Sequence, residues 1–272
     1  MLIFPNCKIN LGLSVQEKRN DGFHNIETVL FPVKINDVLE IIKSPDGLFS
    51  FEQSGIKIPG NPENNLVIKA YHLLRKEFLL PYVHIHLHKN IPMGAGLGGG
   101  SADAAFAIRL LNNLFNLKLS VNKMEDIARQ LGSDCAFFIQ NKPVLASGKG
   151  DLFKQIDMDL SDYHIMIVKP NIHINTPEAY SWIKPANKEK PLIDIFNLPI
   201  NRWKDNLCND FEKEIFRRFH KIEFIKNKLY DLGAIYSAMS GSGAAVFGIF
   251  EKEADFKDEF SDCFIFQSSI GF

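Results

Sequence analysis

One glycine-rich segment constrains this chain more than any other feature. Pro92–Ala105 reads P-M-G-A-G-L-G-G-G-S-A-D-A-A, with five glycines in the seven positions 94–100, between a strand-like and a helix-like segment. Glycine allows positive φ and lets backbone amides approach a ligand closely. The start of the following helix adds N–H groups and a positive dipole end. The sequence therefore predicts an anion-binding loop, most economically for a chain of phosphates.

Three familiar phosphate loops do not fit. Gly94, Gly96 and Gly99 satisfy G-x-G-x-x-G, but a dinucleotide site would want an acidic residue about 20 positions further on. The matching region, Leu114–Ser120, has no carboxylate. The Walker pattern is absent, as are the V-A-I-K, H-R-D and D-F-G motifs of protein kinases.

Composition excludes other classes of protein. The chain has 272 residues, of which 46% are hydrophobic and 23% charged, and these proportions exclude a disordered protein. A net charge of −1 gives no overall basic field for nucleic acid or an anionic membrane. We therefore expect neither partner, and an anionic ligand must be held by local groups. At roughly 150 residues per domain, the chain is one large domain or two modest ones. The charge and aromatic pattern changes after Asp151, so we expect domains at 1–150 and 151–272.

Cysteines and the N-terminus indicate the compartment. The four cysteines are scattered without a C-x-x-C pair, which suits a reducing compartment and argues against structural zinc. No apolar run approaches the roughly 18 residues of a membrane helix. The start, MLIFPNCKIN, lacks a signal-peptide cleavage pattern. We expect a cytoplasmic protein.

Hydrophobic periodicity predicts an α/β or α+β protein. Strands are expected at Lys8–Val15, Ile26–Val33, Asp37–Ile42, Tyr82–His88, His164–Val168, and as a hairpin, Ala234–Met239 and Ala244–Phe250. Helices are expected at about Asn65–Phe78, Ser101–Phe115 with Ser101 as N-cap, Lys123–Leu131, and Asp210–Leu232.

Two strands place polar residues on one face. Asn6, Lys8 and Asn10 alternate with apolar residues, and the simplest interpretation from the residues alone is a solvated sheet face. His84, His86 and His88 also share a face. A metal site there has no neighbouring carboxylate or cysteine in sequence to support it, so a solvated face is favoured.

The lysine strand, the glycine loop of the form P-x-x-x-G-L-G-G-G-S-x-D-A-A and Gly241-Ser242-Gly243 together resemble the GHMP kinase superfamily. Further motifs resemble one branch in their order along nearly the whole chain: Pro5–Leu13, Arg19–Thr28, Leu131–Phe138, Ile174–Tyr180, Asn209–Glu212 and Met239–Ala244. The resemblance implies a two-domain fold, ribosomal-S5-domain-2-like in the N-terminal half and ferredoxin-like in the C-terminal half.

The resemblance implies that Lys8 and Asp134 are the catalytic pair. Phosphoryl transfer to an alcohol needs a group that accepts the hydroxyl proton and cations that offset charge on the moving phosphoryl group. Asp134 would be the base, and Lys8 would stabilise it and the charge nearby. From the residues alone, Asp134 could equally be the N-cap of a helix starting at Cys135.

The resemblance also implies ATP and Mg²⁺ as cofactors, without naming the magnesium ligands. Most members carry two serines after the glycines, whereas this chain has Ala102 at the second position. That alanine puts a hydroxyl–metal contact there in doubt but not the amide cradle. The residues expected to bind the ATP phosphates are Pro92, Met93, Gly94, Ala95, Gly96, Leu97, Gly98, Gly99, Gly100, Ser101 and Ala102.

On the acceptor side, the resemblance implies a cytidine diphosphate-linked methylerythritol, an intermediate of non-mevalonate isoprenoid synthesis. Phe23 and Tyr180 would stack on the cytosine, and His24 would hydrogen-bond its edge. Asn10 and Thr176 would lie near the substrate. For the two aromatic residues, ordinary core packing is the alternative, since the chain has 23 phenylalanines.

Other functions stay open. Another GHMP kinase could act on mevalonate, homoserine or a sugar, and a non-catalytic sensor could use the same fold. The residues matching the cytidine side argue against the first, and the presence of both Lys8 and Asp134 argues against the second. We expect a monomer or homodimer.

Overall fold

A computed structural model describes residues 1–185, 191–253 and 256–270. The chain forms two compact units, each described here by itself. Unit 1 comprises Met1–Cys7, Ile35–Met93 and Gly98–Lys142, and unit 2 comprises Lys8–Lys34, Gly94–Leu97 and Pro143–Phe272. The chain thus passes between units several times. The single domain boundary expected near residue 150 stays a prediction.

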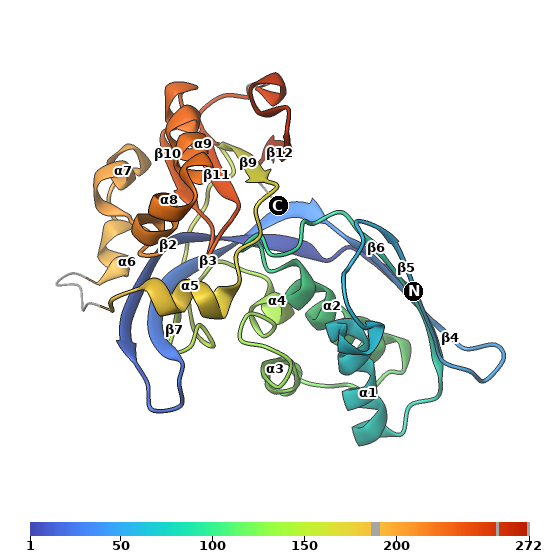
Figure 1. The fold of residues 1–272 in the computed structure, drawn as a ribbon. Coiled ribbons are helices and arrows are strands. Elements are labelled where there is room, and N and C mark those ends of the chain that lie inside the picture. Colours follow the sequence, from blue (N-terminus) through green and yellow to red (C-terminus); the bar gives the residue numbers. More distant parts are fainter. Residues whose placement is uncertain (186–190, 254–255, 271–272) are drawn as a thin grey trace. The chain divides into compact units, whose positions relative to one another are not determined.

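Unit 1 contains a four-stranded sheet in the order β1-β4-β6-β5 (Figure 1). β4 runs antiparallel to β6, whereas β5 runs parallel to it. Apolar residues of β6 alternate with its histidines, so one face of the strand is buried. The strands are β1 (Leu2–Ile3), β4 (Val38–Lys43), β5 (Ser50–Gly55) and β6 (Val83–Lys89).

Helices cover this sheet. α2 packs against α1 and β4, and its alanines allow the close approach (Figure 1). α2 starts at Gly99 after Gly98, whose φ is +71°, so the expectation that Ser101 caps this helix was wrong. Glycine adopts this backbone without strain. The helices are η1 (Pro62–Asn64), α1 (Leu66–Phe78), α2 (Gly99–Leu114), α3 (Val121–Arg129) and α4 (Phe137–Gln140).

Unit 2 contains two further four-stranded sheets, ordered β2-β3-β7-β8 and β10-β11-β9-β12. The first includes two long strands, which contain the predicted strands Lys8–Val15 and Ile26–Val33. In the second sheet the predicted hairpin is confirmed as β10 and β11. The strands are β2 (Asn6–Lys18), β3 (His24–Asn36), β7 (Val144–Ser147), β8 (Leu152–Gln155), β9 (His164–Pro170), β10 (Tyr236–Met239), β11 (Val246–Phe250) and β12 (Cys263–Ser269).

The helices of unit 2 correct one prediction. The helix expected over Asp210–Leu232 is two helices, because Phe219 leaves helical geometry at φ −133° and ψ 72°. Phe219 packs instead against the unit's hydrophobic core. The helices are α5 (Thr176–Trp182), α6 (Leu192–Ile195), η2 (Ile200–Arg202), α7 (Trp203–Asn206), α8 (Glu212–Arg218), α9 (His220–Asp231) and η3 (Lys257–Phe260).

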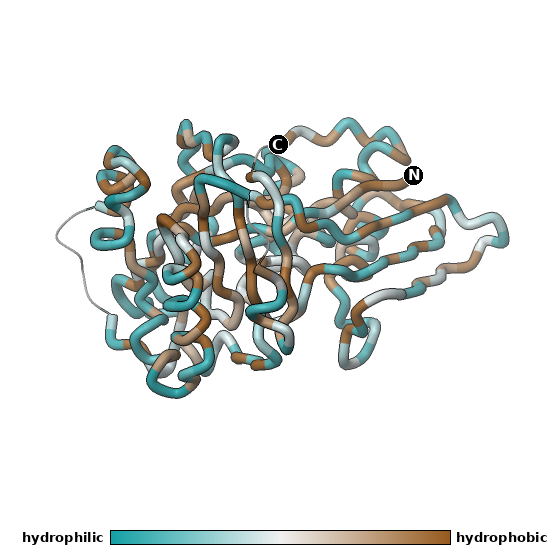
Figure 2. Tube along the Cα trace, turned by 90° about the horizontal axis from the view of Figure 1, so that it is seen from above, coloured by the Kyte–Doolittle hydropathy of each residue, from teal (hydrophilic) through white to brown (hydrophobic). Residues whose placement is uncertain are grey.

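Hydrophobic and hydrophilic stretches alternate along the trace of the chain (Figure 2). In unit 2, α9 lies against β9, β10 and β11, and buries Ile222, Ile225 and Leu229 in the core. Among the described residues, none of the helices combines the length and the apolar character needed to cross a membrane.

Candidate functional site

Lys8 and Asn10 are held on β2 in unit 2. Both are almost fully buried, at 4% and 3% exposure, so the solvated-face interpretation was wrong. The Lys8 ammonium donates to Asn10 Oδ1 at 2.6 Å, and the Lys8 backbone N–H donates to the Leu97 carbonyl at 2.9 Å. A buried ammonium must be compensated by such polar partners. The strand lysine is therefore fixed next to the unit 2 part of the glycine loop.

Asn10 is in turn oriented by neighbouring strands. Its side-chain amide donates to Thr28 Oγ1 at 3.0 Å, and the Thr28 hydroxyl donates to the Gly12 carbonyl at 2.5 Å. The Asn10 backbone N–H donates to Ser240 Oγ at 3.3 Å. The Lys8–Asn10–Thr28 chain thus consists of buried groups with assigned partners, as a preorganised polar site requires.

The loop segment Gly94–Leu97 lies on the turn between β10 and β11. The Ser240 hydroxyl donates to the Gly96 carbonyl at 2.9 Å, and the Ala245 N–H donates to the Ala95 carbonyl at 3.1 Å. A Cβ added at Gly96 would lie 1.9 Å from the Ser240 carbonyl oxygen. Only glycine fits there, so one glycine of the loop serves packing against this turn.

In unit 1, the rest of the loop leads into α2. A Cβ at Gly99 would lie 2.8 Å from Ile91 Cγ2, so this glycine permits close packing on the sheet. The Ala102 N–H already donates to the Gly98 carbonyl at 2.9 Å within the helix. The backbone N–H of Ala102, which was predicted to bind phosphate, is therefore already used in a hydrogen bond of the helix. The backbone N–H groups of the first helical turn come before Ala102 and have no partner within the helix.

The turn that carries Asp134 lies beside the start of α2. The Ser101 hydroxyl lies near the Cys135 thiol. Burial, and to a lesser extent the Asp134 carboxylate, raise the pKa of Cys135 to about 12, although the Ser101 hydroxyl lowers it. Asp134 is partly exposed in this turn, and α4 is capped by Ala136 instead. The helix-cap alternative was therefore wrong, and two of the predicted motifs meet within unit 1.

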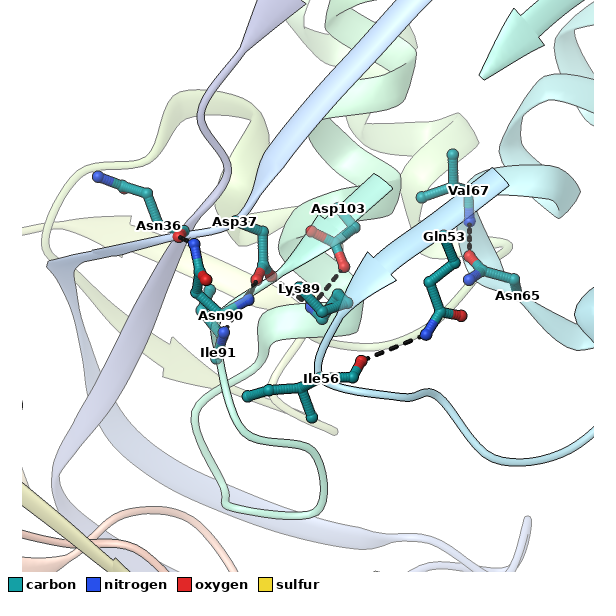
Figure 3. Close-up of polar contacts among 10 residues, drawn as sticks. All are labelled: Asn36, Asp37, Gln53, Ile56, Asn65, Val67, Lys89, Asn90, Ile91 and Asp103. Atoms are coloured by element: carbon teal, nitrogen blue, oxygen red, sulfur yellow. Dashed lines mark hydrogen bonds and ion pairs between the residues drawn. The ribbon is translucent and has the colours of Figure 1, made fainter. Parts of the chain in front are cut away.

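Lys89, Asp37 and Asp103 form a buried cluster of charges near the start of α2. Lys89 Nζ contacts Asp37 Oδ2, and lies 2.7 Å from Asp103 Oδ2 (Figure 3). Asp37 Oδ1 also accepts the backbone N–H groups of Asn90, at 2.6 Å, and Ile91, at 2.9 Å. All three charged side chains are almost fully buried. The cluster ties the beginning of α2 to the ends of β3 and β6.

The two carboxyl groups of this cluster differ in their surroundings. Burial raises the pKa of Asp103 to about 8 against the attraction of Lys89, and Asp103 Oδ1 has no hydrogen-bond partner among the described residues. Burial opposes a charged Lys89, but Asp103 and Asp37 outweigh it and raise the lysine's pKa. Asp37 Oδ1 accepts two backbone N–H groups, whereas Asp103 Oδ1 accepts none, so the burial of Asp103 is the less compensated of the two.

The residues expected on the acceptor side lie together in unit 2, in an arrangement that the sequence does not predict. The His24 ring stacks on Tyr180, with centroids 4.9 Å apart and planes at 13°. Burial and Lys18 both lower the pKa of His24. Phe23 is 53% exposed, under Lys149 Nζ at 5.0 Å, so core packing does not explain it. Tyr180 packs at the core edge against Phe211.

Thr176 starts α5, where its hydroxyl lies 3.0 Å from Ser242 Oγ. The predicted acceptor residues Asn10 and Thr176 therefore both contact the turn between β10 and β11. The roles of all these residues stay predictions.

The histidine strand face is partnered by other side chains. His84 Nε2 lies 3.1 Å from Asp46 Oδ1. His86 and His88 each lie 2.9 Å from the Ser54 hydroxyl. Asp46, which lies in a loop, was not expected near this strand. Hydrogen bonds to the neighbouring loop and to β5 thus explain how these rings are held.

Sequence reasoning missed the Lys89 cluster, although a signal was present. In β6 the apolar residues Val83, Ile85 and Leu87 alternate, and Lys89 is the next residue on that buried face. Asp103 stands among alanines on an otherwise apolar helix. A lysine and an aspartate at buried positions each require a partner, and pairing the two would have located the cluster.

Comparisons with known proteins agree on one family. The model described as "GHMP kinases N terminal domain" matches residues 65–142, and "GHMP kinases C terminal" matches residues 197–263. A curated protein from Bacteroides fragilis, 4-diphosphocytidyl-2-C-methyl-D-erythritol kinase, is 51% identical over 99% of this chain and 100% of its own length.

Solved structures agree in fold. A crystal structure of 4-(cytidine 5'-diphospho)-2C-methyl-D-erythritol kinase is 29% identical, with a TM-score of 0.77, and the match covers 91% of this chain and 89% of that one. The mevalonate kinase of Methanococcus jannaschii has a TM-score of 0.73 at 14% identity, with 98% of this chain and 97% of that one covered. The fold class expected from the sequence is confirmed.

The buried cluster predicts a large stability effect. Lys89→Met should lower the free energy of unfolding by about 3–5 kcal/mol, because it leaves two acidic groups buried without their cation. Urea unfolding followed by circular dichroism measures this. Lys123→Met, which removes the exposed partner of Glu77, should cost about 0–1 kcal/mol. Equal effects of the two substitutions would contradict the argument.

Proposed function

This chain belongs to the GHMP kinase family of ATP-dependent small-molecule kinases, and we propose that it phosphorylates the 2-hydroxyl of 4-diphosphocytidyl-2-C-methyl-D-erythritol. Relatives about half identical over the whole chain carry that kinase's name. One observation supports the proposed site most directly. The Ser101 hydroxyl lies near the Cys135 thiol, so the turn that carries Asp134 is beside the start of α2, where the glycine loop ends.

The proposed reaction is a direct transfer. The substrate hydroxyl oxygen attacks the γ-phosphorus of ATP, the bond to the β–γ bridging oxygen breaks, and ADP leaves. Asp134 accepts the hydroxyl proton, and Lys8 offsets developing negative charge. The phosphates lie on the amides of the glycine loop and the first turn of α2, whose dipole favours anions.

Magnesium belongs to this proposal as the partner of ATP, and it would neutralise charge on the phosphates. Mg²⁺ takes oxygen ligands and commonly relies on the phosphates themselves. At the start of α2, Ser101 offers a side-chain oxygen, whereas Ala102 offers none. These residues therefore fit a Mg²⁺ ion whose ligands would mostly be oxygens of the ATP phosphates.

The cytidine would bind at the rings of unit 2. No third ring fits between His24 and Tyr180 at their 4.9 Å separation. The cytosine would therefore take the place of the His24 ring on Tyr180, with Phe23 on its other face. His24 would then hydrogen-bond the edge of the base, and its lowered pKa keeps it neutral at pH 7. A cytoplasmic location and a monomer or homodimer complete the proposal.

A coupled ATP assay tests the acceptor. The cytidine diphosphate substrate should be turned over far faster than mevalonate, homoserine or a hexose. Preference for one of those alcohols would replace the proposed acceptor within the same family. Nucleotide binding without turnover of any of them would favour the non-catalytic sensor.

Asp134→Asn should lower kcat by about 10²–10⁴-fold, because the amide cannot accept the hydroxyl proton. The fold and the ATP dissociation constant should change little. Steady-state kinetics and calorimetry measure the two effects. Asp126→Asn, at an exposed residue of α3, serves as the matched control and should leave kcat unchanged. A kcat near wild type in Asp134→Asn would reject Asp134 as the base.

Gly98→Val should weaken ATP binding at least about tenfold, while acceptor binding changes little. Gly98 has φ +71°, and a β-branched side chain opposes that backbone and blocks approach to the amides. Calorimetry with ATP measures the loss. Gly47→Val introduces a similar strain at φ +75° in an open loop and should leave ATP affinity intact. Unchanged affinity in a folded Gly98→Val variant would exclude the phosphate cradle.

Phe23→Ala should raise KM for the cytidine substrate by about 5- to 150-fold, the equivalent of about 1–3 kcal/mol of stacking. Phe23→Tyr keeps the ring face and should be nearly silent. KM for ATP should hardly move in either variant. Phe224→Ala, which removes another exposed ring, is the control. A folded Phe23→Ala with wild-type KM would leave the ring without a stacking role.

A further inference from the structure

The segment Asn209–Glu212 (N-D-F-E) has no role in the function proposed above. It runs beside β2 in unit 2, where Asn209 forms a parallel bridge with Leu13. The Leu13 N–H donates to the Cys208 carbonyl at 2.9 Å, and the Asp210 N–H donates to the Leu13 carbonyl at 2.9 Å. Asp210 Oδ2 accepts the Val15 N–H at 2.8 Å. The segment is therefore anchored on β2, the strand that carries Lys8 and Asn10.

Asn209 reaches from this anchor to the turn between β10 and β11. Its buried amide Nδ2 donates to the carbonyls of Met239, at 2.7 Å, and Gly241, at 2.8 Å. Its Oδ1 accepts the Phe211 N–H at 3.0 Å. Two donors and one acceptor are thus all used, and an asparagine side chain provides both functions at one position.

Glu212 bonds the residue that directly precedes the same turn. Its Oε1 accepts the Met239 N–H at 2.8 Å, while Oε2 lies 2.7 Å from Lys226 Nζ. Burial raises the pKa of Glu212. Both backbone groups of Met239 are therefore bound by side chains of one short segment, which fixes the point where the turn begins.

The turn, Ser240–Gly243, touches three parts of the proposed site. Ser240 Oγ bonds the Gly96 carbonyl and the Asn10 N–H. Ser242 Oγ lies 3.0 Å from Thr176 Oγ1. Phe211, bonded to Asn209, packs edge-on against Tyr180 at 4.9 Å. The side chain of Asn209 bonds Met239, Gly241 and Phe211, so it would act on these site residues through the turn and Phe211.

We propose that Asn209 is a positioning residue that sets the Ser240–Gly243 turn and, through it, the Gly94–Leu97 part of the nucleotide loop. Its effect on catalysis rests on the proposed function. Its effect on the turn does not, because the Ala245–Ala95 backbone bond reports the contact between turn and loop directly.

The first experiment follows that bond by hydrogen exchange in the full chain. Asn209→Ser shortens the side chain and removes the two amide donors. The Ala245 amide should then exchange at least about tenfold faster, the effect of losing buried hydrogen bonds. Asn206→Ala is the control, because Asn206 is an exposed asparagine whose side-chain amide donates to the nearby Arg202 carbonyl. It should leave the Ala245 amide unchanged.

The second experiment measures ATP affinity by calorimetry and both KM values by steady-state kinetics. A role confined to stability would lower the melting temperature and the active fraction while the constants stay at wild type. A positioning role should raise the ATP dissociation constant and its KM about tenfold in protein that thermal melting shows to be folded. Wild-type exchange at Ala245 together with wild-type ATP affinity would overturn the proposal.

A double-mutant cycle between Asn209→Ser and Ser240→Ala is a third test of the proposal. Ser240→Ala breaks the link between the turn and Gly96. If Asn209 acts through that turn, the loss of ATP affinity in the double variant should be smaller than the product of the single losses. Asn209→Asp, which keeps the acceptor and loses the donors, replaces Asn209→Ser if the latter does not fold. Independent losses in the cycle would reject the proposal.

A failed acceptor assay is distinguishable from a failed positioning role. If wild type transfers no phosphate to the cytidine substrate while Asn209→Ser still accelerates exchange at Ala245, the acceptor is wrong and Asn209 keeps its role. If wild type performs the transfer and Asn209→Ser changes neither exchange nor ATP affinity, the proposed function stands and the positioning role fails.

Discussion

In unit 2, the candidate site depends on backbone lying directly against backbone. Gly96 approaches the Ser240 carbonyl so closely that an added Cβ would lie 1.9 Å from its oxygen. The Ser240 hydroxyl and the Ala245 N–H then bond the carbonyls of Gly96 and Ala95. Because an absent side chain allows this contact, neither segment can shift far without breaking hydrogen bonds of the other. Loop, turn and the strand of Lys8 thus form one rigid polar assembly.

In unit 1, a different interaction serves the same purpose. Lys89 joins two buried acids, one following β3 and the other in α2. Buried ion pairs contribute little net stability compared with apolar residues, but they are costly to break. Such a cluster favours one arrangement of the elements that meet there. The start of α2, where the phosphates are proposed to bind, is thereby held against the sheet.

Much of the fold could be predicted from local pattern. The alternation in β6, the helical periodicity of α1 and the turn between β10 and β11 are properties of neighbouring residues, and all three were predicted. Errors arose where distant packing decided the outcome. The predicted helix Asp210–Leu232 is interrupted at Phe219, whose ring packs on the core. Short strands such as β8 carry too few residues for a pattern to show.

By itself, the sequence determined the glycine loop, the positions of the family's motifs and hence the kind of chemistry, because residue type and spacing limit what a backbone can bind. The tertiary structure decided which polar groups are buried and with whom. Lys8 and Asn10 alternate along their strand as solvated residues would, yet both are buried, and Asn10 bonds Thr28 and Ser240, which lie 18 and 230 positions away in sequence. Burial and partnership are properties of the packed chain, since they depend on residues that only folding brings together.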